Sequence, residues 1–169
     1  GGHYLSALTY MYASTGNQEI KGRLDYVISE LKRCYDANGN GYISGVPGGK
    51  QIWKEISEGN IRAASFGLND RWVPLYNIHK IYAGLRDAYL ITGNKDALKM
   101  FLGLAEWMYR LTDGLTEVQI QDMLRSEQGG LNEVFADAAA LSGDPRYLDL
   151  AKRFSHKYLL GFILEKEDR

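Results

Sequence analysis

The segment DANGNGYIS, which begins at Asp36, has the pattern of the first half of a calcium-binding loop. Asp36, Asn38 and Asn40 stand at alternate positions, where their oxygens could surround a cation, and Gly41 allows a sharp turn. Such a loop needs a bidentate glutamate at its twelfth position, and that position is Pro47 here. Asn, Asp and Gly also form ordinary turns, because they tolerate left-handed backbone angles. We therefore interpret the segment as a loop that ends a helix.

Cys34 is the only cysteine, so the chain cannot form an internal disulfide, and the cellular compartment stays open. Its place near the end of an amphipathic helix favours a small packed residue over a nucleophile. A zinc site needs about four converging N, S or O ligands, and one cysteine with three dispersed histidines offers no such set. We predict no metal site within this chain.

The functional signal is the placement of polar side chains directly ahead of three apolar helices. The three segments read GGHYL, LYNIHKIY and EQGGLNE. Free amide groups and the positive end of the helix dipole lie at such N-termini. The chain also has twelve tyrosines and three tryptophans, and amphipathic rings of this kind often line grooves for polar, ring-shaped ligands.

The elements that must position these side chains are helical hairpins, and the pattern occurs three times. The repeats run from Ala7 to Ile20, from Gly84 to Leu98 and from Val134 to Leu148. In each, an apolar helix ends at a Thr/Ser-Gly-Asn/Asp turn and a second helix follows at once. The glycine suits the left-handed position that ends a helix, and the Asn or Asp can cap the next one.

The two helices of each hairpin differ in their pattern. The first is apolar on nearly all sides, whereas the second is amphipathic, with apolar residues at three- and four-residue spacing. Such inner and outer layers are typical of a helical toroid or a solenoid. We predict an all-α fold with a long loop from Ala37 to Pro74 and a short helix from Thr116 to Leu124. A closed toroid takes about six hairpins, so we expect residues 1–169 to be part of a larger catalytic toroid domain.

The composition fits one globular unit, since 45% of the 169 residues are hydrophobic and 24% are charged. The formal net charge of −1 gives no reason to expect nucleic acid or an anionic membrane as a partner. No apolar run in the sequence is long enough to span a bilayer. The first residues lack the basic start of a signal peptide, and their apolar residues are periodic.

Four strings, in order along nearly the whole chain, closely resemble one family. They are GGHYLSALTYMYASTGN, NGNGYISGVPGG, RWVPLYNIHKIYAGLRDAYLITGN and QDMLRSEQGGLNEVFADAAALSGD. The family is the bacterial glycoside hydrolase family of β-L-arabinofuranosidase-like proteins. The resemblance implies an (α/α)6 toroid of the six-hairpin type. It also implies an exo-acting enzyme that releases terminal L-arabinofuranose, or a related sugar, from plant glycans.

The resemblance implies a sugar-binding role for particular residues of these strings. His79 would hydrogen-bond sugar hydroxyls, although a histidine that caps neighbouring backbone is the alternative. Gln128 stands where many relatives have histidine, and it can still offer one acceptor and two donors. Asn132 and Glu133 follow in the same motif; Glu133 would contact sugar, orient its neighbours or favour the helix N-terminus electrostatically. His3 is similarly placed on the first inner helix.

The resemblance also assigns aromatic residues to the wall of the pocket. Tyr42 would point into the pocket from a rim loop whose glycines allow close approach of the chain. Trp72 and Tyr76 are candidates for surfaces on which a furanose ring packs, and both could equally be core residues.

Catalysis in the family resembles retaining hydrolysis by a zinc-held cysteine, with further Cys and Glu ligands and a Glu acid/base. The motifs that carry those residues do not occur in this sequence. Glu133 and Asp70 could be nominated as the carboxyl pair of an ordinary retaining glycosidase, which stands about 5–5.5 Å apart. We expect the chain to supply part of the sugar pocket, with the catalytic residues and any zinc ligands outside it.

Two other functions fit the same scaffold. One is a helical-repeat domain that binds glycan or protein without chemistry, and the other is a toroid enzyme such as a sugar epimerase or a lyase. Exposed apolar flanks of the inner helices would favour self-association.

Overall fold

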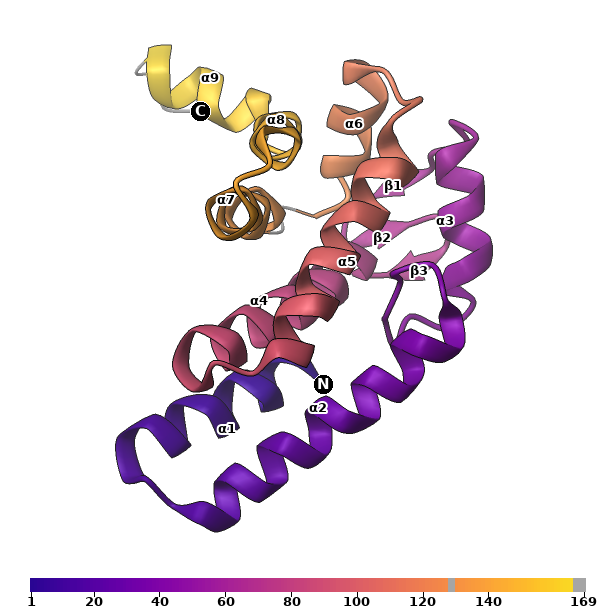
Figure 1. Ribbon diagram of the computed structural model, residues 1–169. Helices are drawn as coiled ribbons and strands as arrows, with labels where there is room; N and C mark the ends of the chain where they lie inside the picture. The colour runs from indigo at the N-terminus through magenta and orange to yellow at the C-terminus, as the bar shows by residue number, and fades with distance from the viewer. Residues whose placement is uncertain (128–129, 166–169) are drawn as a thin grey trace.

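The computed structural model describes residues 1–127 and 130–165 (Figure 1). Its helices are α1 (Gly2–Thr15), α2 (Gln18–Asn38), α3 (Gly49–Ser57), α4 (Pro74–Thr92), α5 (Lys95–Thr112), α6 (Glu117–Leu124), α7 (Leu131–Ser142), α8 (Pro145–Arg153) and α9 (Lys157–Glu165). Three two-residue strands lie between α3 and α4, namely β1 (Ala63–Ala64), β2 (Gly67–Leu68) and β3 (Arg71–Trp72). The predicted helical architecture and the short helix near residue 120 are confirmed.

The three predicted hairpins are α1–α2, α4–α5 and α7–α8. The glycine that ends the first helix of each has a left-handed φ of 65° to 75° (Gly16, Gly93 and Gly143). The residue after each glycine accepts a backbone N–H of the next helix through its side chain (Asn17, Asn94 and Asp144). Each such cap is worth about 1 kcal/mol, so the turn sequence alone fixes where both helices stop and start.

The inner helices α1 and α4 run side by side in the same direction (Figure 1). They touch through glycines: a Cβ at Gly2 would overlap the carbonyl of Lys80, and one at Gly84 would lie 2.8 Å from the carbonyl oxygen of Gly2. Leu5 and Leu85 are fully buried in these helices. The close contact brings the N-terminal ends of α1 and α4 together.

A chain of aromatic rings joins the α4–α5 hairpin to the α7–α8 hairpin. Tyr82 packs edge-on against Phe101 at 5.9 Å and Phe135 at 5.4 Å, and Phe135 packs against Phe154 at 5.1 Å, all between ring centroids. Such pairs add about 0.5–1.5 kcal/mol beyond area burial. The buried Tyr82 hydroxyl donates to the carbonyl of Leu104, and burial raises its pKa. This core holds α7 against α4.

The segment from Ala37 to Pro74, which we predicted as a long loop, contains α3 and the sheet. Ile52, Trp53 and Ile56 lie on the buried face of α3, at helical spacing. Trp53 packs edge-on against Trp107 of α5, with ring centroids 5.5 Å apart. The prediction of a loop was wrong here. The helix is short, so its periodic apolar residues are few, and the turn-forming residues on either side of it favoured a loop.

The sheet is an antiparallel meander that leads directly into α4. Its register pairs Ala63 with Leu68, Ala64 with Gly67, Gly67 with Trp72 and Leu68 with Arg71. Asn69 and Asp70, between β2 and β3, have φ of 47° and 60°, as a tight two-residue hairpin turn requires. Asn69 is buried, and its amide donates to the carbonyl of Asn60 at 2.8 Å.

The loop that followed a calcium pattern is a helix end, as interpreted. Gly39 has a φ of 69° and donates its N–H to the carbonyl of Tyr35, which ends α2. The side chain of Asn40 accepts the N–H of Tyr42 at 3.0 Å. These contacts account for the Asn and Gly residues of the loop as turn formers.

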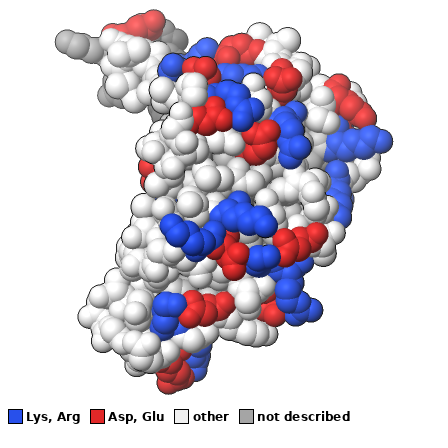
Figure 2. All heavy atoms as spheres, viewed as in Figure 1, with Lys and Arg blue, Asp and Glu red and all other residues white. Residues whose placement is uncertain are grey.

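Acidic and basic side chains are interspersed on the face drawn in Figure 2. Apolar side chains also reach the surface, above all on α9, where Tyr158, Leu159, Leu160, Ile163 and Leu164 are exposed. No helix within residues 1–127 and 130–165 is long and apolar enough to cross a bilayer.

Candidate functional site

Polar side chains meet at the N-terminal ends of the three inner helices. His3 of α1 lies against Tyr76 of α4, with its Nε2 2.7 Å from the Tyr76 hydroxyl. On the other side of α4, Nε2 of His79 lies 4.0 Å from Oε2 of Glu133 on α7. Four of the predicted site residues therefore gather around the start of α4.

Glu127 caps the N-terminus of α4, a role that the sequence analysis did not predict. The carboxylate accepts the N–H of Leu75 at 2.6 Å and that of Tyr76 at 3.1 Å, and Glu127 itself is buried. Burial raises the pKa of Glu127, against the lowering effect of the two amides. The carboxylate thus takes the place of an N-cap side chain, which the preceding residue, Val73, cannot supply. Its only sequence signal was its position beside Gln128.

His79 is 7% exposed, and burial lowers its pKa to about 4. The imidazole is therefore neutral at pH 7, with one nitrogen as donor and the other as acceptor. Its Nε2 is buried and has no hydrogen-bond partner among the described residues. A Cβ at Gly130 would lie 2.9 Å from that nitrogen, so the backbone at Gly130 covers it closely.

Glu133 belongs to an ionic cluster centred on Arg86. Nη1 of Arg86 lies 2.7 Å from Oε1 of Glu133 and 2.6 Å from Oδ2 of Asp137, and the guanidinium also bonds Asp87. The hydroxyl of Ser6 donates to Asp87 at 2.7 Å. The hydrogen bond from Arg86 lowers the pKa of Glu133, so its carboxylate is ionised at neutral pH.

A cavity of about 620 Å³ opens beside His3 and Tyr76, a size common for small-molecule sites. The ammonium of Lys80 lies 4.9 Å from the centre of the Tyr76 ring, at cation–π distance. Ser44, from the predicted rim loop, and Cys34 also line the cavity. Cys34 is exposed, which corrects its interpretation as a packed residue, because it faces this cavity and not the core.

The remaining predicted residues lie apart from this cluster. Tyr42 is 5% exposed and packs on Trp107 with ring centroids 4.8 Å apart, so it is a core residue and does not point into a pocket. Trp72 is 79% exposed on β3, beside a different hollow. Asn132 is exposed and lines a small hollow against α9. Gln128 lies outside the described residues.

Asp70 and Glu133, the two carboxyl groups nominated as a catalytic pair, do not contact each other. Asp70 lies on the turn between β2 and β3, where it bonds Arg62 at 3.0 Å. Glu133 is held by Arg86 on α7. The two carboxylates thus belong to different ionic contacts.

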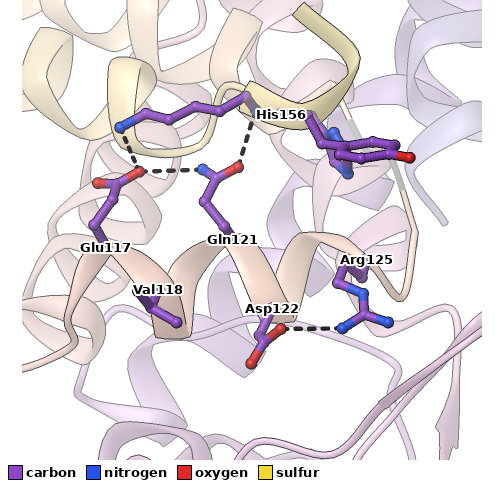
Figure 3. A pocket seen from close by; sticks show the side chains of 8 residues that line it. Glu117, Val118, Gln121, Asp122, Arg125 and His156 are labelled. Carbon is purple, nitrogen blue, oxygen red and sulfur yellow. Dashed lines mark hydrogen bonds and ion pairs between the residues drawn. The ribbon is translucent and has the colours of Figure 1, made fainter. Parts of the chain in front are cut away.

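A second hollow, of about 850 Å³, lies between α6 and α9 (Figure 3). Gln121 holds its base by donating to the carbonyls of Arg153 and Ser155 and accepting the N–H of Lys157. Lys157 pairs with Glu117 at 2.7 Å. The polar groups at this base therefore bond one another, and the predicted site residues lie elsewhere.

The family resemblance raised zinc as a cofactor. No three His, Cys, Asp or Glu side chains stand close enough together to hold a metal ion in the described part of the chain. The described residues therefore do not fit a zinc site.

Residues 1–169 match the family described as β-L-arabinofuranosidase, GH127 catalytic domain. No curated protein matches the sequence significantly. The match spans the inner-helix ends where His3, Tyr76, His79 and Glu133 gather. The chain belongs to the family of GH127 β-L-arabinofuranosidase catalytic domains.

Proposed function

We propose that the chain forms part of the site in which a glycoside hydrolase binds a terminal L-arabinofuranose or a closely related sugar. The family match supports glycosidase chemistry. The observation that carries the sugar site is the buried Nε2 of His79, which has no partner among the described residues and lies 4.0 Å from Oε2 of Glu133.

A ligand hydroxyl group can hydrogen-bond both Nε2 of His79 and Oε2 of Glu133. An unsatisfied buried polar atom costs about 1–3 kcal/mol, and a ligand that bonds it recovers part of that cost. The ionised carboxylate of Glu133 is an acceptor only, so the hydroxyl would donate to Glu133 and share its remaining hydrogen-bonding capacity with His79. Because Nε2 is buried beside Gly130, binding requires the backbone there to shift.

The neighbouring cavity supplies the second half of the proposed site. Tyr76 offers a half-exposed ring face and a hydroxyl, and His3 bonds that hydroxyl. A ring edge and face of this kind suit a small, polar sugar ring. These residues bind and orient the sugar, and the cleavage of its glycosidic bond is assigned to none of them.

The second candidate is a glycan-binding domain without hydrolysis. The state of Glu133 and Glu127 favours it, since Arg86 engages Glu133 and two backbone amides engage Glu127. Arg86 lowers the pKa of Glu133, which disfavours Glu133 as a general acid, and the N–H groups of Leu75 and Tyr76 engage both oxygens of Glu127.

The test measures release of 4-nitrophenol from 4-nitrophenyl β-L-arabinofuranoside and, separately, binding of methyl β-L-arabinofuranoside by calorimetry. We expect His79→Gln to weaken binding at least tenfold. The matched control is His156→Gln, in the hollow between α6 and α9, which should leave binding unchanged. Both assays use the full-length protein, because the residues that cleave the bond are expected outside residues 1–169. Binding without release there supports the second candidate, and equal binding by wild type and His79→Gln overturns the sugar site.

A further inference from the structure

Arg86 is a nearly buried cation among three carboxylates. Its side chain is 16% exposed, and one nitrogen, Nη1, bonds both Glu133 and Asp137. The Nε and Nη2 groups lie 3.3 and 3.2 Å from Oδ1 of Asp87. A buried guanidinium is stable only when such partners satisfy it.

Arg86 and Asp87 connect α4 to both of its inner neighbours. Arg86 reaches α7 through Glu133 and Asp137, while Asp87 accepts the Ser6 hydroxyl of α1. Two adjacent residues of the central helix therefore fix the side chains on either side.

The two oxygens of Glu133 have different surroundings as a result. Oε1 is taken by Arg86 at 2.7 Å, and Oε2 faces Nε2 of His79 at 4.0 Å. The Glu133 side chain is 59% exposed, so without Arg86 it would sample several rotamers in solvent. The guanidinium selects the arrangement in which Oε2 points towards His79.

We infer that Arg86 is a positioning residue, which holds Glu133 so that one carboxylate oxygen is reserved for a ligand hydroxyl beside His79. The inference rests on the proposed sugar site. It adds a specificity rule: the ligand group at this point must be a hydrogen-bond donor, so a sugar with a hydroxyl is favoured over its deoxy or O-methyl analogue. The charge of Arg86 supports this role, because it keeps Glu133 ionised and acceptor-only.

The first experiment compares Arg86→Gln, Arg86→Lys and the control Arg125→Gln, an exposed arginine paired only with Asp122 among the described residues. We expect Arg86→Gln to weaken binding of methyl β-L-arabinofuranoside at least tenfold, equivalent to about 1.4 kcal/mol. Arg86→Lys should restore part of the affinity, and the control should match wild type. Unchanged affinity in Arg86→Gln overturns the inference.

Two further variants distinguish a positioning role of Arg86 from a merely structural one. Asp137→Asn weakens the same cluster but leaves the bond between Arg86 and Glu133 in place, so binding should be retained. In a Glu133→Gln background, Arg86→Gln should cause no further loss, because Arg86 acts through Glu133. Equal losses in Asp137→Asn and Arg86→Gln, or a full additional loss in the double variant, overturn the inference.

An NMR titration of His79 gives a readout that needs no ligand. The charged groups acting on this ring are Lys80, Arg86 and His3, which lower its pKa, and Glu133, which raises it. Arg86→Gln removes a cation, which raises the pKa of His79, and lets Glu133 move away from the ring, which lowers it. If Arg86 holds Glu133 beside His79, Arg86→Gln should therefore raise the pKa of His79 less in the wild-type background than in a Glu133→Gln background. If wild type does not bind the sugar, the proposed function fails, and this titration still decides whether Arg86 holds Glu133 beside His79. An equal rise of the His79 pKa in the two backgrounds counts against Arg86.

Discussion

Gly130 lies beside the buried nitrogen of His79, and Gly130→Ala tests that packing directly. The added methyl carbon would lie 2.9 Å from Nε2, 3.0 Å from Cε1 and 3.4 Å from Oε2 of Glu133. Contacts below about 3.4 Å are repulsive, and inserting a methyl group into a packed region costs about 1–3 kcal/mol. The φ of −67° at Gly130 is open to alanine, so the cost comes from packing and not from the backbone.

Alanine also restricts the unfolded chain, which recovers about 0.4–1 kcal/mol. The net loss is about 1–2 kcal/mol, and a chain of this length should lose about 2–8 °C in Tm. The matched control is Gly22→Ala in α2, where an added Cβ meets nothing within 4 Å. That change should stabilise the helix by about 0.5–1 kcal/mol and raise the Tm.

The assay is thermal unfolding followed by circular dichroism, with sugar binding measured on the same samples. Gly130→Ala should lower both stability and affinity, because the methyl group fills the space beside Nε2. A Tm that rises as in Gly22→Ala, together with wild-type binding, would refute the packing described around His79.

Three further predictions concern single side chains. The pKa of His79, lowered by burial to about 4, lies below its unfolded value of about 6.5, so the unfolded chain binds more protons between these pH values. Stability should fall by up to about 3 kcal/mol as the pH drops from 6.5 to 4, and denaturant titrations of His79→Gln should show a flatter profile. Tyr82→Phe should cost about 0.5–1.5 kcal/mol, since it removes the hydroxyl that donates to Leu104, and urea unfolding measures this loss. Cys34 is exposed, so a thiol reagent such as DTNB should label it fully in the native protein; labelling only in urea would contradict its position.

The hairpins could be predicted because their signals are local. Each helix end depends on one glycine and on the residue after it, so the sequence around Gly16, Gly93 and Gly143 specifies the turn without help from distant parts of the chain. The convergence of His3, Tyr76, His79 and Glu133 followed from the same hairpins, since parallel inner helices bring their N-termini to one end.

The parts that could not be predicted depend on distant partners. The role of Arg86 could not be predicted from the sequence, because its partners Glu133 and Asp137 stand 47 and 51 residues away. Tyr42 was predicted to point into the pocket because it follows glycines of the rim loop, but its ring packs against Trp107 of α5 in the core. The role of each residue depends on a tertiary contact, and neither its residue type nor its spacing in the sequence could predict that contact.

The contact between α1 and α4 through Gly2 and Gly84 limits which sequences this fold can accept. Even alanine at Gly2 would collide with the carbonyl of Lys80 and force the helices apart. The hydrogen bond between His3 and Tyr76 would then lengthen, although neither glycine takes part in it. The side chains allowed at these two positions are therefore restricted by the close approach of the two helix backbones, and the geometry of the His3–Tyr76 pair depends on that restriction.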